Sequence, residues 1–437
     1  MKQTPGTPRK IFTILNVIAV IVGIVIGIGI FRLPPIVAQN ASSGWEFILF
    51  WVAGGGLSIL GALCYAELAT SHPDAGGEYH FLKKAYGPAL SFLFSWGRMT
   101  VIQTGSIALA GFILGDYASS FLELGPYSSS VYAAVAVVVL TALNIWGTRP
   151  SKRAQNAMAG VVVSMLLLLG LLGVTIGTPL PEASSGGTAS GDGSAGLAMI
   201  FVLLTYGGWN EAAYLSGELR NVRRNMVKVL VTGILLITAL YVLINLAYLQ
   251  VLGLDGLRAA DTVGIALADQ VLGTGSGYFV GAIIILAALS TANATIITGA
   301  RTNYALGRDF APLGILGIWN RPTDTPRNAL LVQGGIALLL VLLGAFTEEA
   351  VSTMVDYTAP VFWFFLMVTT LSLFVFRYRG DPPSPPYRVP GYPVTPVLFA
   401  ATCAYLLWSS LTVTGYGALY GAGILLLGIP VYWWVRR

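Results

Sequence analysis

The sequence predicts an all-α integral membrane protein with twelve transmembrane helices, and both composition and segment length indicate this fold class. Of its 437 residues, 55% are hydrophobic and 10% are charged, and the mean hydropathy is +0.75. A soluble domain with this balance would expose large apolar surfaces to water. Apolar stretches long enough to cross a hydrocarbon core of roughly 30 Å as a helix recur along the chain. They are continuous runs rather than short alternating segments, which argues against a β-barrel.

Twelve apolar stretches define the expected helices. They cover residues 11–37, 45–70, 88–121, 131–146, 154–176, 195–217, 227–252, 275–304, 328–346, 351–377, 394–412 and 416–435. The first stretch follows basic N-terminal residues, as the apolar part of a signal peptide does, but no small-residue cleavage site comes after it. We therefore expect a retained first span.

The loops between these stretches predict the orientation of the chain. Lysine and arginine concentrate in alternate loops, which places both termini on the cytoplasmic side of the plasma membrane. The loop at residues 178–194 is rich in Gly and Ser and has no basic residue, as expected of an exterior loop. Apolar residues at helical spacing within residues 254–273 predict a helix along the outer surface. The net charge of +5 follows from this topology, so we expect no nucleic-acid partner.

The sequence offers little for catalysis or for a cofactor. Both cysteines, Cys64 and Cys403, fall in apolar stretches, and the two histidines, His72 and His80, are expected to be solvated loop residues. Metal-ligand spacing and nucleophile motifs are missing. We therefore expect neither an enzyme nor a bound cofactor.

Two of the expected helices carry glycines at mid-membrane depth. Gly27 and Gly29 flank Ile28 in the first span, and Gly207 and Gly208 interrupt the sixth. A helix broken at this depth is tolerated only where it lines protein or a water-filled cavity. Interruptions at corresponding places in two halves indicate the binding site of a secondary transporter, with these spans beginning two five-helix repeats. A channel would instead need polar rings along a pore.

The backbone chemistry of such breaks suits an α-amino acid. Half-helix N-termini present free N–H groups to a carboxylate, and half-helix C-termini present carbonyls to an ammonium group or a small cation. Glycine permits the unwound conformation and lets a ligand approach the backbone. The alternative for any single glycine, such as Gly23, is close helix packing. The matched pair of breaks favours a binding site.

Several segments resemble the amino acid–polyamine–organocation superfamily, and within it the bacterial relatives of the L-type amino acid transporters. The first-span motif "GIVIGIGIF" and the second-span signature "YAELATSHPDAGGEYHFLKKAYGP" are similar to those of the family. So are "YGGWNEAAYLSGELRNVRRNM" in the sixth span, "LSTANATIITGARTNYALGRD" in the eighth and "YRVPGYP" before the eleventh. The matches occur in the family's order and cover nearly the whole chain.

The resemblance implies a LeuT-type fold that moves amino acids by alternating access, as a symporter or an exchanger. Two inverted five-helix repeats would occupy residues 11–176 and 195–377, and two further helices residues 394–435. Neutral L-amino acids are the expected substrates. The alternatives are cationic amino acids or polyamines, and a sensor that binds an amino acid without transporting it.

Motif positions carried over from the family define an expected substrate site in the two breaks. Leu204 stands where relatives often have a bulky aromatic lid, and Ile28 where they commonly have Ser, Ala or Thr. The full expected set is Ile26, Gly27, Ile28, Gly29, Ile30, Leu204, Tyr206, Gly207, Gly208, Asn210 and Glu211.

Two departures from the family bear on coupling and on partners. Val162 stands where many members carry a lysine in place of a sodium ion, so a lysine-based coupling mechanism is not expected. Residues 122–130 lack the cysteine that links animal relatives to a glycoprotein subunit, so no disulfide-linked partner is expected. A proton or a sodium ion is the expected coupling ion if transport is symport.

Charged residues near or within the spans are candidates for coupling or gating, because a charge at bilayer depth costs about 2.5 to 3.5 kcal/mol. Glu211 is a candidate proton carrier or contact for a substrate ammonium group, and the alternative is a structural carboxylate paired with Arg98. Glu67 is expected to partner a basic residue. Arg32 is expected either to close an outer gate or to extend to the interface.

Hydroxyl groups in the eighth span define a candidate sodium site. Ser290 and Thr291 could coordinate sodium together with first-span carbonyls near Gly23 and Ile26. The alternative is that these hydroxyls bond the preceding helical turn, as they commonly do in membrane helices.

Overall fold

The computed structural model describes residues 10–27, 29–177, 195–260, 262–347, 350–413 and 416–436. Ile28, which we expected in the substrate site, and the loop at residues 178–194 lie outside these ranges. In chain order the helices are α1 (Ile14–Val25), α2 (Gly29–Arg32), α3 (Pro34–Gln39), α4 (Gly44–Ser71), α5 (Glu78–Tyr86), α6 (Pro88–Gly97), η1 (Arg98–Ile102), α7 (Gln103–Phe121), α8 (Ser128–Trp146), α9 (Thr148–Thr175), α10 (Ala195–Tyr206), η2 (Trp209–Leu215), α11 (Val222–Ala259), α12 (Val263–Leu272), α13 (Gly277–Asp309), η3 (Ala311–Gly317), α14 (Arg327–Gly344), α15 (Ala350–Arg379), α16 (Val394–Val413) and α17 (Tyr416–Arg436).

The predicted all-α membrane fold is confirmed. Within the described ranges, 11 helices are long and apolar enough to cross a membrane. The sixth expected span is shorter because it is divided into α10 and η2 by a turn at Gly207 and Gly208. The helix expected within residues 254–273 is present as α12.

Local sequence signals set several helix ends. Thr13 accepts a hydrogen bond from the backbone of Asn16, whose side chain accepts one from the backbone of Thr13, and this capping box begins α1. Ser43 caps α4 through its side chain. α5 stops at Gly87, which has a φ of +94°, and Pro88 begins α6.

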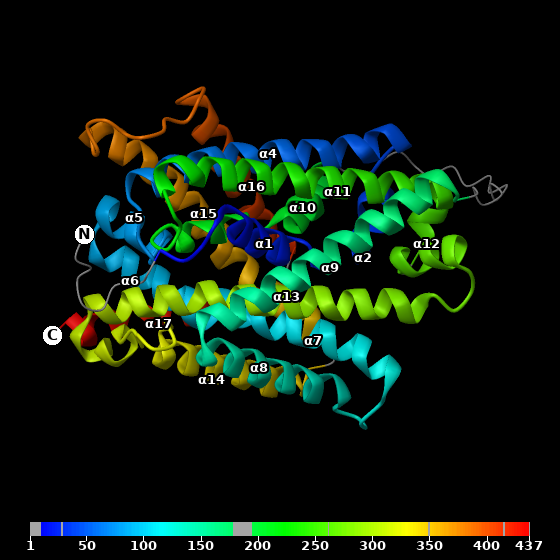
Figure 1. Cartoon of the computed structure of the whole chain (residues 1–437). Coiled ribbons are helices and arrows are strands. Elements are labelled where there is room, and N and C mark those ends of the chain that lie inside the picture. The colour runs from blue at the N-terminus through cyan, green and yellow to red at the C-terminus, as the bar shows by residue number, and fades with distance from the viewer. Residues whose placement is uncertain are drawn as a thin grey trace.

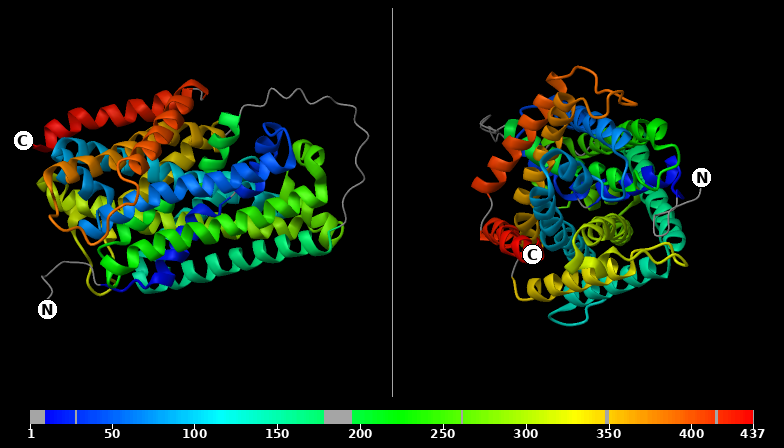
Figure 2. Two further views of the ribbon diagram at one scale, coloured as in Figure 1. Left: turned by 90° about the horizontal axis from the view of Figure 1, so that it is seen from above. Right: turned by 90° about the vertical axis from the view of Figure 1, so that its left-hand side faces the viewer.

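Most helices run side by side in one bundle (Figures 1 and 2). α12 lies at one end, and α5 and the end of α17 lie at the other (Figure 1). We call this second end the basic end, because Lys83, Arg308 and Arg379 lie around α5 there. α1 contacts α9, α11, α13 and η2. Outer helices such as α8 and α14 expose Val135 and Leu342, as expected of a surface that contacts lipid.

Backbone and ionic contacts tie the two broken helices together at the basic end. Phe12 N donates to Glu218 O at 3.1 Å, and Arg220 N donates to Phe12 O at 3.1 Å. The segment before α1 is thus paired with the segment after η2. Arg301 on α13 forms a buried salt bridge with the Glu218 side chain, which fixes this junction to a third helix.

The expectation of solvated histidines is wrong for His72. Its side chain is buried because it packs on Phe376, with ring centroids 4.4 Å apart. Its Nδ1 lies 3.1 Å from Lys84 Nζ. Burial and the neighbouring lysine lower the pKa of His72 to about 4, so the neutral imidazole is favoured.

Candidate functional site

The first break lies between α1 and α2. α1 ends at Val25, and Ile26 leaves helical geometry with φ −79° and ψ 78°. Gly27 N donates back to the Val25 carbonyl at 2.9 Å, and the helix resumes at Gly29. Ile26 and Ile30 are fully buried on either side of the interruption. The chain is therefore unwound where the glycine pattern indicates.

The second break lies between α10 and η2. Gly208 has a φ of +112°, in the left-handed region that favours glycine. A Cβ added at Gly208 would lie 2.3 Å from Ile24 Cγ2 on α1. Glycine is required here both for the backbone conformation and for close approach to the first broken helix.

The two breaks are also in contact between α2 and α10. A Cβ added at Gly29 would lie 3.0 Å from Thr205 Cγ2, near the end of α10. The start of α2 thus packs directly on the end of α10. The structure brings together two interruptions that lie far apart in the sequence.

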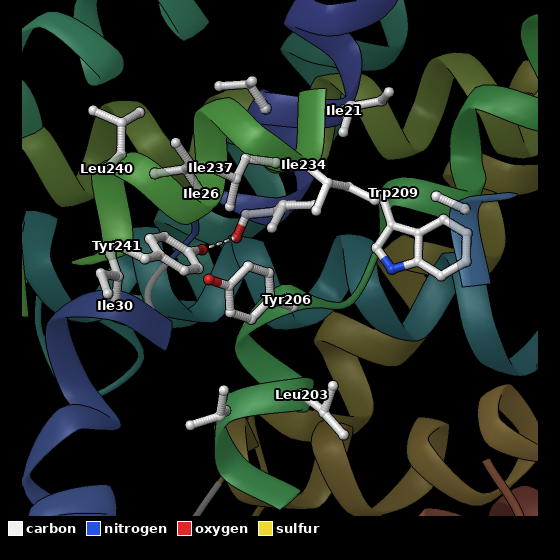
Figure 3. Close-up of a cluster of buried hydrophobic side chains, with 14 of the residues drawn as sticks. Ile21, Ile26, Ile30, Leu203, Tyr206, Trp209, Ile234, Ile237, Leu240 and Tyr241 are labelled. Atoms are coloured by element: carbon white, nitrogen blue, oxygen red, sulfur yellow. Dashed lines mark hydrogen bonds between the residues drawn. The ribbon is translucent and has the colours of Figure 1, made fainter. Parts of the chain in front are cut away.

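A tyrosine on α11 joins the carbonyl ends of both breaks. The Tyr241 hydroxyl lies 2.8 Å from Val25 O and 3.2 Å from Thr205 O. Its ring packs edge-on against Tyr206 with centroids 5.1 Å apart, and the two rings lie beside Ile26 in Figure 3. One hydroxyl has one hydrogen, so it donates fully to only one of the two carbonyls at a time. Val25 O also accepts from Gly27 N, and the pair of carbonyls still has capacity for a further donor.

A small pocket borders the second break. Gly207, Gly208 and Asn210 line one side, and aromatic side chains including Trp363 and Phe399 line the other. The remaining lining residues are Ser58, Leu203, Trp209, Phe362, Leu366, Thr402, Cys403 and Leu406. Asn210 Oδ1 is buried and has no hydrogen-bond partner among the described residues. Because an unpaired buried acceptor is unfavourable, Asn210 Oδ1 is available to a ligand donor.

Two further residues of the expected site lie at the end of α10. Leu204 is half-buried. Tyr206 is buried and donates from its hydroxyl to Trp51 O on α4 at 3.0 Å. This bond occupies the hydrogen of the Tyr206 hydroxyl.

Glu211 forms a buried ion pair with Arg98. Arg98 Nη2 lies 2.5 Å from Glu211 Oε2, and Gln103 Nε2 donates to the same oxygen at 3.1 Å. Arg98 begins the π-helical turn η1, an interruption of span three that re-aims its side chains. Arg98 Nε also donates to Thr302 on α13 at 2.9 Å. Glu211 is thus a charge-paired carboxylate that links η2 to span three.

A second buried carboxyl, that of Glu78, lies close to the Arg98–Glu211 pair. Glu78, the first residue of α5, accepts hydrogen bonds from the hydroxyls of Tyr65 and Tyr214 and from Asn210 Nδ2, the last at 3.0 Å. The Arg98 guanidinium lies 3.7 Å above the Tyr214 ring. Burial raises the pKa of the Glu78 carboxyl above its ordinary value.

The candidate sodium ligands hydrogen-bond across helices. Thr291 Oγ1 donates to Gly23 O at 2.8 Å, and Ser290 Oγ accepts from Gln155 Nε2 at 2.9 Å. Gln155 Nε2 also lies 3.3 Å from Ala19 O on α1. The Gln155 amide therefore bridges α1 and α13 on the side of α9.

The two candidate gating residues differ in their surroundings. Arg32, at the end of α2, is exposed and forms no salt bridge with any residue in the described ranges. Glu67 on α4 is buried and accepts two hydrogen bonds from Arg377, each at 2.7 Å, and one from Val389 N at 2.6 Å. Glu67 thus fixes the end of α15 and the segment after it to α4.

Sequence reasoning missed Tyr241, Gln155 and Glu78. Tyr241 lies in a continuous apolar run, so no local signal distinguishes it from a packing aromatic. Glu78 belongs to the second-span signature, but nothing in its local sequence indicates that its side chain is buried. A search for polar residues on spans packed against the two breaks would have found Tyr241 and Gln155.

Comparisons with known proteins identify the relatives of this chain. The family model described as amino acid permease matches residues 12–430. The b(0,+)-type amino acid transporter 1 of Homo sapiens is 31% identical over 92% of this chain and 83% of its own length. The Mus musculus protein of the same name is 32% identical over 87% of this chain and 79% of its own length. The large neutral amino acids transporter small subunit 2 of Homo sapiens is 27% identical over 97% of this chain and 80% of its own length.

Proposed function

The chain belongs to the amino acid permease family and is a multi-pass amino acid transporter, and from this premise we propose that it carries neutral L-amino acids. The two breaks would hold the substrate's carboxylate and ammonium groups, and the pocket beside the second break would hold its side chain. Transport, rather than catalysis or sensing alone, is the proposed activity.

One observation carries this proposal: the Tyr241 hydroxyl lies between Val25 O and Thr205 O. These are carbonyls at the C-terminal ends of α1 and α10, where the half-helix dipoles favour a positive charge. With one hydrogen shared between two acceptors, the arrangement suits an added ammonium group. The substrate carboxylate would face the backbone N–H groups at the start of α2, at Gly29.

The proposal of a neutral substrate rests on the charge around the second break. The carboxylate of the expected site, Glu211, is paired with Arg98, so the pair has no net charge to offer a cationic side chain. The pocket walls include Trp363 and Phe399, which suit an apolar or aromatic side chain. The name of one relative, the large neutral amino acids transporter small subunit 2, agrees with this class.

We propose that transport needs no sodium. The Gln155 amide donates to Ser290 Oγ and lies beside Ala19 O, so it links α1 to α13 in the way that a bridging cation would. Thr291 Oγ1 already donates a hydrogen bond to Gly23 O. Either exchange or proton symport then moves the substrate.

The proposed orientation places the basic end on the cytoplasmic face of the plasma membrane, following the positive-inside rule. Both termini would be cytoplasmic. The absence of cysteine from residues 122–130 supports transport without a disulfide-linked subunit. The two breaks would begin two inverted five-helix repeats, with α16 and α17 outside them.

Uptake into liposomes tests this function. The purified full chain would be reconstituted, and labelled leucine, lysine and putrescine would be offered with and without sodium and with and without internal leucine. We expect leucine uptake that is independent of sodium. Stimulation by internal leucine would identify exchange. Uptake of lysine or putrescine in place of leucine would overturn the neutral assignment, and binding without uptake would identify a sensor.

A pair of matched variants tests whether uptake depends on the break between α1 and α2. Gly29→Val would place side-chain atoms against Thr205, where a Cβ alone would lie 3.0 Å from Thr205 Cγ2. Gly160→Val is the control, because a Cβ there meets nothing within 4 Å. We expect loss of leucine uptake in the first variant only.

A further inference from the structure

Four glutamate side chains are buried in the described residues, and one of them differs from the other three in its partners. Glu67 pairs with Arg377, Glu211 with Arg98 and Glu218 with Arg301. The exception is Glu78, which forms no salt bridge within the described ranges. A buried carboxylate without a cation is strongly unfavourable unless it is neutralised.

The hydrogen-bond partners of Glu78 suit both protonation states. Its partners are the hydroxyls of Tyr65 on α4 and Tyr214 on η2, together with Asn210 Nδ2. If Glu78 is ionised, all three groups donate to it. If it carries a proton, the acid donates to one tyrosine oxygen, because a phenol can both donate and accept. Guanidinium groups, which hold the other three buried glutamates, can only donate and therefore favour the ionised form.

The charge balance among Glu78, Glu211 and Arg98 favours a protonated carboxyl. The titratable and charged groups around Glu78 are Tyr65, Tyr214, Glu211 and Arg98. One guanidinium serves two carboxyl groups. It contacts Glu211 directly, and it stacks on the ring of Tyr214, whose hydroxyl donates to Glu78. With both glutamates ionised the cluster would carry a net negative charge in the protein interior. One proton restores neutrality.

The position of Glu78 connects this proton to the transport pathway. Asn210 donates to Glu78 Oε1 through Nδ2, and its Oδ1 faces no other partner in the described part of the chain. Asn210 also lines the pocket beside the second break. Glu78 itself begins α5, at the basic end, so it links that end of the protein to the broken helix.

We propose that Glu78 is a proton-binding site of this transporter, and that gain or loss of its proton sets the transport rate through Asn210 and the second break. The proton is exchanged with solvent, and no other group changes its covalent state. This inference rests on the proposed transport function. It assigns the proton to Glu78 rather than to Glu211, whose charge is already balanced by Arg98.

The first test compares pH profiles of leucine transport in liposomes containing the full chain. Internal and external pH are kept equal and varied from about pH 5 to about pH 9. For the wild type we expect a single-proton dependence, in which the rate changes about tenfold per pH unit beyond the midpoint. Glu78→Gln should flatten this profile to within about twofold. Glu46→Gln, a change of the same type at a half-buried residue in the first turn of α4, should keep the wild-type profile.

A second variant keeps Glu78 and removes one of its donors. Tyr214→Phe takes away a hydrogen bond that stabilises the ionised carboxylate, so it should move the midpoint to higher pH. A purely structural role for Glu78 would lower the rate at every pH and leave the midpoint in place.

Infrared spectroscopy provides a readout that does not need transport. At neutral pH the wild type should show the carbonyl stretch of a buried carboxylic acid, and Glu78→Gln should lack it while Glu46→Gln retains it. Persistence of this band in Glu78→Gln, or a wild-type midpoint in that variant, would overturn the assignment. A flat profile in Glu211→Gln alone would move the proton to Glu211. If the wild type transports no amino acid at any pH, the proposed function fails instead.

Discussion

Tyr241 on α11 and Val25 at the end of α1 are joined by a hydrogen bond of 2.8 Å between the phenol and a main-chain carbonyl. The same hydroxyl lies 3.2 Å from Thr205 O on α10. A single side chain thus fixes the carbonyl ends of both broken helices. Because it belongs to neither of them, it can hold their relative position without taking part in the breaks themselves.

Tyr241→Phe should weaken substrate binding. Loss of the hydroxyl removes a bond worth about 1 to 1.5 kcal/mol and leaves the two carbonyls without a shared donor, so the apparent KM for leucine should rise about tenfold. Concentration-dependent uptake measures this. Tyr248→Phe is the control, because its hydroxyl lies 3.5 Å from Ile30 O, too far for a strong bond. Equal effects in both variants would contradict the prediction.

Gly208→Ala should abolish transport and reduce stability. A residue other than glycine at φ +112° is strained, and the new Cβ would lie 2.3 Å from Ile24 Cγ2. Together these effects should lower the free energy of unfolding by at least about 2 kcal/mol. Thermal unfolding and leucine uptake report the loss. Gly56→Ala, where a Cβ meets nothing within 4 Å, should match the wild type; a stable, active Gly208→Ala would refute the close approach.

Glu211→Gln should destabilise the protein, because it leaves the buried Arg98 without its counter-charge. Breaking such a pair costs about 3 to 5 kcal/mol. The double variant Glu211→Gln with Arg98→Met removes the uncompensated charge and should recover much of the lost stability. Unfolding curves in detergent compare the three proteins. A single variant as stable as the wild type would show that the pair does not balance a buried charge.

Stability should fall in mild acid because of His72. Its pKa is about 4 in the folded protein and about 6.5 when unfolded, so the unfolded chain binds more protons between these values. The contribution of the neutral His72 imidazole to the free energy of unfolding is complete above about pH 6.5 and is lost as the pH falls toward about 4. We expect a loss of about 1 to 2 kcal/mol by about pH 5, discounted for partial solvation.

His72→Gln provides the comparison for this pH dependence. The variant lacks the titrating imidazole, so its unfolding temperature should fall less between neutral pH and about pH 5 than that of the wild type. Above about pH 7 the difference between the two proteins should be constant. Parallel curves across the whole range would exclude His72 as the source.

The fold was largely predictable from the sequence because its determinants are local. Bilayer thickness and the need to pair backbone groups turn each long apolar run into a helix, whatever its neighbours are. Glycines at 27, 29, 207 and 208 marked the places where two helices unwind, because the conformation of the chain there depends on the missing side chain. The local prediction of a solvated His72 is wrong, because the imidazole packs on Phe376 of α15, a contact that its own segment does not reveal.

The polar partners of the site could be predicted only in part, because the pairing of Glu211 with Arg98 is one of two alternatives that the sequence leaves open. Arg98 and Glu211 are 113 positions apart, and Tyr241 and Val25 are 216 apart. No periodicity or spacing in one segment reveals a bond to another segment at such a distance. The resemblance to a family predicts Asn210 in the substrate site, and the cost of a buried charge marks Glu211, but neither distinguishes a free carboxylate from a paired one.

By itself, the sequence determined that this protein is a membrane bundle with two broken helices, because hydrophobic length and glycine act on the chain locally. Only the tertiary structure decided that Arg98 neutralises Glu211, that Tyr241 joins the two breaks, and that Glu78 is buried without a salt bridge to any described residue. The physical reason is that the state of a buried charge depends on every group packed around it, and that packing exists only in the folded protein.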